Sequence, residues 1–131
     1  MRVRLKADIS VSDISVSDRK RLMARFQQGK EYTVLEIGGP LLRIHDEPSN
    51  TAGLWAARYF EVSNAGLPSN WVIALDAEGR VQLAPRRWLE PGFWSAFYDD
   101  EPAENLTWAQ RRQRRDEAEA IYEEELKVIQ A

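Results

Sequence analysis

The change of hydrophobic period at Glu31 limits most strongly what this chain can fold into. From residue 31 to residue 84 the sequence consists of short segments whose side chains alternate between two faces, the pattern of half-buried strands. Turns with glycine or proline separate them, and no connection is long enough for a crossover helix, so the strands must pair antiparallel. The sequence predicts five strands, at 31–37, 41–45, 55–62, 70–75 and 80–84, with a loop at 46–53.

A sheet of this size must curl to cover its own core. The predicted fold class is therefore α+β, built on a small, partly open, antiparallel five-stranded SH3-like β-barrel. The turns at 38–40 and 76–79 are expected to join two hairpins. On the first strand, Tyr32, Val34 and Glu36 are expected on one face and the intervening residues on the other.

Helices are predicted on both sides of the barrel. Ser17 or Asp18 is expected to cap a short N-terminal helix that ends near Gly29. Thr107 and Gln110 form a capping-box pattern, which predicts a long C-terminal helix that continues to about residue 129. Between barrel and helix, residues 93–98 crowd aromatic side chains into one or two helical turns.

The N-terminal arm has a weaker pattern. Residues 2–6 alternate like a half-exposed strand, and the pentapeptide ISVSD occurs twice in tandem, at 9–13 and 14–18. We interpret the repeat as a linker with some strand character. The chain is thus predicted to be a single domain, 1–131, made of an N-terminal strand, repeat and helix (1–29), a β-barrel core with its closing aromatic turn (30–98) and a C-terminal helix (103–130).

Composition excludes several classes of protein. Cysteine is absent, so the chain has neither disulfides nor thiolate metal sites. No window of eighteen apolar residues predicts a membrane span, and the first ten residues lack the apolar run of a secretory signal, so a cytoplasmic location is expected. The net charge is −3, and only residues 1–30, with eight basic and three acidic side chains, are clearly basic. The protein is therefore not a strong polyanion binder overall.

Catalytic machinery is not recognisable in the sequence. His45 is the single histidine, and its neighbours Asp46 and Glu47 alternate across a strand instead of converging on one site. We interpret it as a structural or surface histidine. No nucleophile motif and no glycine-rich phosphate loop is present. The sequence thus predicts a protein that is not an enzyme, with no catalytic residue, cofactor or metal site.

The five tryptophans are many for this length and have two interpretations. Large rings fill and seal a small core, which we favour for Trp71, Trp88 and Trp94. Flat aromatic faces also bind peptides, nucleobases or methylammonium groups. Because Trp55 follows a polar loop and Trp108 opens the last helix, packing and partner contact stay equally open for these two.

An arginine cluster at 111–115 resembles a nucleic-acid-binding patch. On a helix, however, Arg112 faces Asp116 and Arg115 faces Glu119, which partly neutralises it. The acidic run at 99–104 is expected to fold back onto the arginines, and the alternative is a dipolar surface for a partner. The candidate partner-binding residues are Trp55, Asp99, Asp100, Glu101, Glu104, Trp108, Arg111, Arg112 and Arg115.

The middle of the chain resembles a family of small, mostly uncharacterised bacterial proteins. The resemblance covers about residues 29–102 and rests on GKEYTVLEI (29–37), LLRIHDE (41–47), ARYFEV (57–62), LPSNWVI (67–73), LAPRRWL (83–89) and GFWSAFYDD (92–100), which contain the motifs RIxDE, FEV, PSNWV, PxxWL and GFWxxF in this order. It implies no catalytic residue. Proteins of this kind are similar to immunity proteins, which neutralise a toxin by covering its active site, so the resemblance implies a toxin as partner.

Three functional hypotheses follow. The first is a non-enzymatic protein-binding module, in its narrower form an immunity protein that docks acidic residues into a toxin's positive cleft. The second is a nucleic-acid-associated regulatory module that uses the basic residues of 2–6, 19–21 and 111–115. The third is an auxiliary β-domain of a phage or secretion assembly, in which the C-terminal helix forms a homodimer. Membrane association is not expected.

Overall fold

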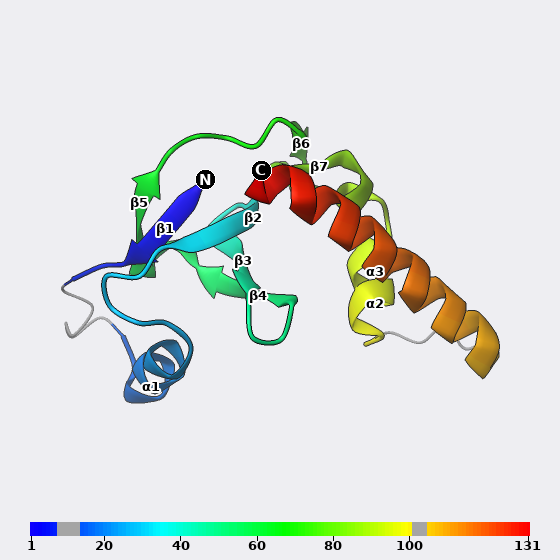
Figure 1. The fold of residues 1–131 in the computed structure, drawn as a ribbon, viewed down its shortest axis with the longest axis horizontal. Helices are drawn as coiled ribbons and strands as arrows, with labels where there is room; N and C mark the ends of the chain where they lie inside the picture. The colour runs from blue at the N-terminus through cyan, green and yellow to red at the C-terminus, as the bar shows by residue number, and fades with distance from the viewer. Residues whose placement is uncertain (8–13, 101–104) are drawn as a thin grey trace.

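The computed structural model describes residues 1–7, 14–100 and 105–131. In these ranges the chain forms a mixed fold of helices and an open antiparallel sheet (Figure 1). The elements are β1 (Arg2–Leu5), α1 (Val16–Arg25), β2 (Tyr32–Gly38), β3 (Leu41–Asp46), β4 (Thr51–Ala56), η1 (Ala57–Tyr59), β5 (Phe60–Asn64), β6 (Trp71–Leu75), β7 (Val81–Pro85), η2 (Arg86–Leu89), α2 (Phe93–Tyr98) and α3 (Trp108–Gln130).

Strand β2 is the centre of the sheet. One of its edges pairs with β3, which pairs in turn with β4. The other edge is shared, because Tyr32 and Thr33 pair with β1 while Ile37 and Gly38 pair with β7. Two wings, β1–β5 and β7–β6, therefore start from the same edge of one strand and separate from each other.

The strand predicted in the N-terminal arm is confirmed as β1, but the five-stranded barrel is wrong in number, because residues 32–85 form six strands and β1 joins them in a seven-stranded sheet. The segment predicted as one strand at 55–62 is two strands, β4 and β5, with the 3-10 turn η1 between them. Strand β4 also begins at Thr51, inside the predicted loop 46–53, because it continues the hairpin with β3 down to the pair Asp46–Thr51. The hairpins β2–β3 and β6–β7 are confirmed.

Apolar side chains form a core on each side of the sheet. The first lies under α1 and the β1–β5 wing and contains Val3, Leu5, Leu22, Phe26, Val34, Leu42, Ile44 and Phe60. The second lies under α2 and α3 and contains Leu35, Ala52, Trp88, Phe93, Ala96, Ala118, Tyr122, Leu126 and Ile129. A register shift between Val34 and Glu36 sends these two side chains to opposite cores, so the expectation that they share a face is wrong.

The short helix α1 begins earlier than predicted. Ser15, not Ser17 or Asp18, is the N-cap, and its hydroxyl oxygen accepts a hydrogen bond from the backbone N–H of Asp18 at 3.1 Å. The second ISVSD copy therefore starts a helix instead of a strand, while the first copy lies outside the described residues. The helix ends at Arg25, before the predicted stop, and buries Leu22 against the first core.

The predicted capping box of α3 is confirmed. The Gln110 backbone N–H donates to the Thr107 hydroxyl at 3.1 Å, and the Thr107 N–H donates to the Gln110 side chain at 2.8 Å. The C-terminal half of the helix packs on the sheet through Tyr122 and Leu126, whereas its N-terminal half extends beyond the strands (Figure 1). None of the helices among the described residues is both long and apolar enough to cross a membrane.

A buried ion pair connects the sheet to α2. Arg43 Nε donates to Glu36 Oε2 at 2.7 Å, and both side chains are less than 10% exposed. Arg43 also donates to the Tyr98 hydroxyl at 2.8 Å, Tyr98 donates to the Ala52 carbonyl at 2.7 Å, and the guanidinium lies 3.7 Å from the centre of the Trp94 ring. Burial raises the pKa of Glu36, although the charge of Arg43 opposes this.

Replacing one partner should be far more damaging than replacing both. We expect Arg43→Ala to lower the free energy of unfolding by about 3–5 kcal/mol, because it leaves the Glu36 carboxylate buried without a counter-ion. The double variant Glu36→Leu/Arg43→Met should lose much less. Urea unfolding measures both, with Arg4→Ala, which breaks an exposed pair with Glu61, as the control. Equal losses for Arg4→Ala and Arg43→Ala would contradict this role of burial.

Candidate functional site

The single histidine, interpreted from the sequence as a structural or surface residue, is buried in the structure. His45 on β3 is buried, and its Nδ1 atom lies 2.9 Å from the hydroxyl of Tyr122 on α3. Burial lowers the pKa of His45, while the nearby carboxylates of Glu47, Asp46 and Glu123 oppose this effect. Among the described residues, no group of three or more histidine and carboxylate side chains is placed to hold a metal ion.

Four of the tryptophans are packing residues to different degrees. Trp88 is fully buried and stacks on Tyr122, with ring centres 5.4 Å apart, while Trp71 and Trp94 are partly buried against the same core. The packing role predicted for these three is confirmed. Trp55, left open by the sequence, is also partly buried and meets the edge of the Phe26 ring at 4.9 Å. It is therefore mainly a core residue.

The expected folding of the acidic run onto the arginines is confirmed for one pair. Asp99 accepts hydrogen bonds from Arg111 Nη2 at 3.0 Å and from Arg111 Nε at 3.3 Å, and both side chains are partly buried. Asp100 is exposed. Glu101 and Glu104 lie outside the described residues. The acidic surface predicted for a partner is therefore reduced to Asp100 in the described part of the chain.

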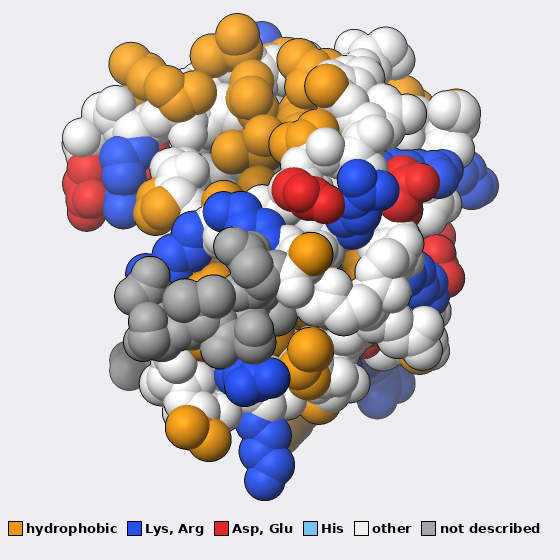
Figure 2. Space-filling view, turned by 90° about the vertical axis from the view of Figure 1, so that its left-hand side faces the viewer, with side chains coloured by type: hydrophobic (Ala, Val, Ile, Leu, Met, Phe, Trp, Pro, Cys, Tyr) orange, Lys and Arg blue, Asp and Glu red, His pale blue; other side chains and the backbone are white. Residues whose placement is uncertain are grey.

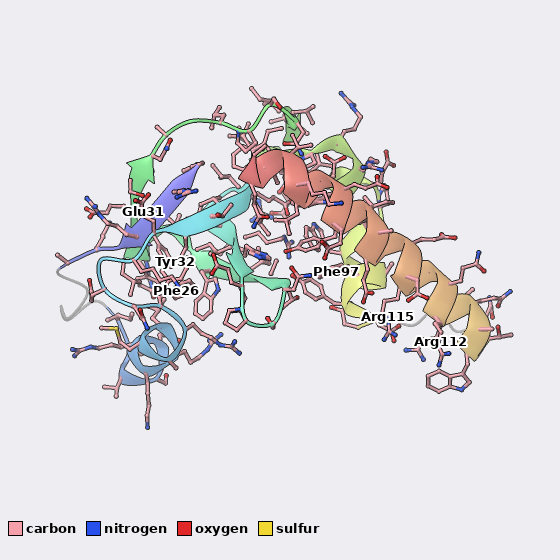
Figure 3. All side chains as sticks on the ribbon, viewed as in Figure 1. Phe26, Glu31, Tyr32, Phe97, Arg112 and Arg115 are labelled. Carbon is pink, nitrogen blue, oxygen red and sulfur yellow. The ribbon has the colours of Figure 1, made fainter. Side chains whose placement is uncertain are left out.

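The projecting end of α3 keeps four of the nine predicted contact residues together. Trp108 is 81% exposed, and Arg112 and Arg115 follow at helical positions i+4 and i+7 on the same side. Figure 3 shows the two arginines on this free end of the helix, away from the sheet. Arg115 makes a 3.8 Å contact with Glu119, but the Arg112–Asp116 pair is absent from the ion pairs of the described residues. We call Trp108, Arg111, Arg112 and Arg115 the α3 tip.

A second exposed surface, which the sequence did not predict, lies on the β6–β7 hairpin. Ile73, Leu75 and Val81 are 77%, 67% and 51% exposed. Leu83 pairs with Ile73, and Val81 pairs with Leu75, so the four side chains share one face of the hairpin. Figure 2 shows hydrophobic side chains gathered over the upper part of the molecule, where Figure 1 places this hairpin and the β5–β6 connection. We call the four residues the apolar hairpin face.

A groove of about 610 Å³ lies between α1 and the β3–β4 hairpin. Phe26, Tyr32 and Trp55 line it beside Arg21 and Lys30, whose charged groups lie 5.7 Å and 5.3 Å from the Trp55 and Tyr32 ring centres. The rings meet edge to face and belong to the first core. The groove is therefore an outer margin of that core, with cations covering its aromatic edge.

Comparison with models of known protein families gives no match, and neither do comparisons with curated protein sequences and with solved structures. The family resemblance of residues 29–102 therefore stays a prediction.

Protonation of His45 should destabilise the fold. Because its pKa is below the ordinary value of 6.5, the folded state binds fewer protons than the unfolded state, and the free energy of unfolding falls as the pH drops below about 6.5. We expect a smaller fall for His45→Gln between pH 6.5 and 5.5, measured by urea unfolding. Parallel pH profiles for the two proteins would contradict this prediction.

Trp108 should contribute almost nothing to stability. Its ring is mostly in water, so Trp108→Ala is expected to change the free energy of unfolding by no more than about 0.5 kcal/mol. Trp88→Ala, which empties a core position, should lose about 3–5 kcal/mol. Urea unfolding of the two variants tests whether Trp108 is free of a structural role, and a large loss for Trp108→Ala would show that it is not.

Proposed function

We propose that this chain is a non-enzymatic protein-binding module and that the α3 tip is its contact surface. The observation that carries the proposal is the 81% exposure of Trp108 on a helical end that extends beyond the sheet. Tryptophan and arginine are the residues that most often dominate the energy of protein interfaces, and here they lie on one helix face. Arg112 and Arg115 suit a partner with carboxylates around an apolar pocket for the indole ring.

The distribution of the cations favours a protein partner over a nucleic acid. The arginines of α1 and those of the α3 tip lie at opposite ends of the long axis (Figure 1). Arg4, from the basic N-terminal strand, is paired with Glu61 at 2.6 Å. A phosphate backbone needs cations along one continuous track, and on α3 the arginines end at Arg115 and are followed directly by Asp116 and Glu117. These positions favour a local contact with a folded partner.

The narrower proposal, an immunity protein whose partner is a toxin, draws its support from the motif resemblance. A homodimer formed through α3 is less favoured, because the apolar side of this helix already packs against the sheet through Tyr122, Leu126 and Ile129.

For the fold, we propose that the sheet is an SH3-like, partly open barrel. Two wings leave one edge of β2 and separate, and the β1–β5 wing curls over the first core, which supports this form.

Site-specific photo-crosslinking tests the proposed contact. A benzophenone amino acid at position 108 should crosslink a specific protein in cells that naturally produce this chain, whereas the same group at the exposed position 16 on α1 should not. The identified partner is then purified and titrated with the chain. We expect Trp108→Ala to weaken binding by about 30-fold or more, which corresponds to about 2 kcal/mol.

The outcomes separate the proposals. A partner that binds Trp108→Ala as tightly as the unchanged chain would show that the α3 tip is not the contact. If the partner has toxic activity, the unchanged chain should inhibit that activity and Trp108→Ala should inhibit it poorly. A partner whose activity the chain leaves unchanged would contradict the immunity-protein form and leave the binding module in place.

A further inference from the structure

The outer edge of β6 pairs with no other strand of the described residues. Among the described residues β6 pairs only with β7, without a register shift, from Trp71–Pro85 to Leu75–Val81. The five residues of β6, Trp-Val-Ile-Ala-Leu, include no charge and no proline. Proteins ordinarily protect an edge strand with lysine, proline or a bulge, because its unpaired backbone groups accept another strand. Strand β6 has none of these protections.

The phase of the hydrogen bonds shows which backbone groups face outward. Asp76 N–H donates to the Arg80 carbonyl at 2.9 Å across the β6–β7 hairpin, and Gly39 N–H donates to the Val81 carbonyl at 3.0 Å on the side of β2. Bonding alternates along an antiparallel strand, so Val72 and Ala74 bond to β7. Ile73 and Leu75 then present both their N–H and C=O groups to the free edge. Trp71 presents its C=O alone, since its N–H donates to the Pro68 carbonyl at 3.3 Å.

The same residues have their side chains on the apolar hairpin face. A row of directly paired residues runs across the sheet through Ile73, Leu83, Ile37, Leu42 and Trp55. At the Leu42 end the first core covers the row, but at the Ile73 end the side chain is 77% exposed. The face of the sheet that is buried in the first core at Leu42 is thus exposed at Ile73, next to the unpaired edge of β6. Such an apolar surface marks an interaction site.

We propose that a second copy of this chain covers the edge, with the two β6 strands antiparallel about a two-fold axis at Ile73. In this register Ile73 exchanges two hydrogen bonds with its own copy, and each Leu75 N–H donates to the Trp71 carbonyl of the other strand. Apart from the Leu75 carbonyl, which faces the Trp71 N–H already bonded to Pro68, the free groups on the edge therefore match their own rotated copy, as the isologous interface of a symmetric dimer requires. Trp71 and Leu75 become cross-strand neighbours on the apolar face.

The charges at the two ends of the hairpin favour this antiparallel arrangement. The turn end carries Asp76 and Glu78, which share Arg80 at 2.8 Å and 3.2 Å and leave a net negative charge. At the opposite end, Arg86 in η2 is exposed, while its neighbour Arg87 is held by Glu124 and Glu125 of α3. Antiparallel pairing of β6 keeps the two acidic turns apart and places each at the end of the other copy that carries Arg86. Parallel pairing would bring like charges together.

A single introduced cysteine tests the register, because the chain has no cysteine of its own. In Ile73→Cys the two Cα atoms should lie about 5.5 Å apart in a hydrogen-bonded pair, a distance that a disulfide spans. The matched control is Leu75→Cys, whose two copies should lie more than about 10 Å apart because position 75 is opposite position 71. Mild oxidation should give covalent dimers of Ile73→Cys and few of Leu75→Cys. Equal dimer yields for the two variants would overturn this register.

Sedimentation velocity over a concentration series tests the association itself. We expect the unchanged chain to form dimers, Ile73→Lys to be monomeric because it opposes two like charges, and Val16→Lys and Trp108→Ala to stay dimeric. Circular dichroism checks that each variant is folded, and Leu75→Lys replaces Ile73→Lys if the latter is not. An unchanged chain that is monomeric at all concentrations would overturn the proposal and leave the edge to a strand of a different protein. The result for Trp108→Ala separates this dimer from the α3 tip.

Discussion

The shared edge of β2 is the constraint from which the rest of the architecture follows. A strand edge can pair with only one strand at each position, so β1 takes Tyr32 and Thr33, and β7 takes Ile37 and Gly38. The β1–β5 wing and α1 cover the first core, while the β7–β6 wing extends past this cover. The covered half of the sheet thus becomes a core, and the uncovered half exposes Ile73 and Leu75.

The Glu36–Arg43 pair connects this sheet to the helical layer. Arg43 on β3 contacts the Glu36 carboxylate, the Tyr98 hydroxyl and the Trp94 ring at once, so it joins two central strands to α2. Burying both charges costs desolvation energy, and the hydrogen bonds and the cation–π contact offset it only with α2 in this position. The pair is therefore better understood as a determinant of where α2 packs than as a large net source of stability.

Local signals in the sequence predicted local structure well. The reciprocal bonds of Thr107 and Gln110, the two hairpins and the burial of Trp88 all follow from short-range spacing or size. The strand break at η1 was missed, although the alternation changes phase there, because Tyr59 and Phe60 are adjacent apolar residues where the chain changes partner from β3 to β1. The exposure of Ile73 could not be predicted, since it depends on how far the β1–β5 wing reaches, and the strand pattern of 70–75 does not contain that information.

The two proposed surfaces are compatible because α3 separates them. Asn70, at the start of β6, donates to Glu125 near the C-terminal end of the helix, and Trp108 lies seventeen residues earlier, a separation of about 25 Å along a helix. Pairing of two β6 strands would therefore leave both α3 tips accessible. A dimer of this kind presents two identical contact surfaces, so a partner with repeated sites would be held more tightly through effective concentration, without any additional contact. Self-association at β6 and partner binding at Trp108 would then reinforce each other while remaining separable by mutation.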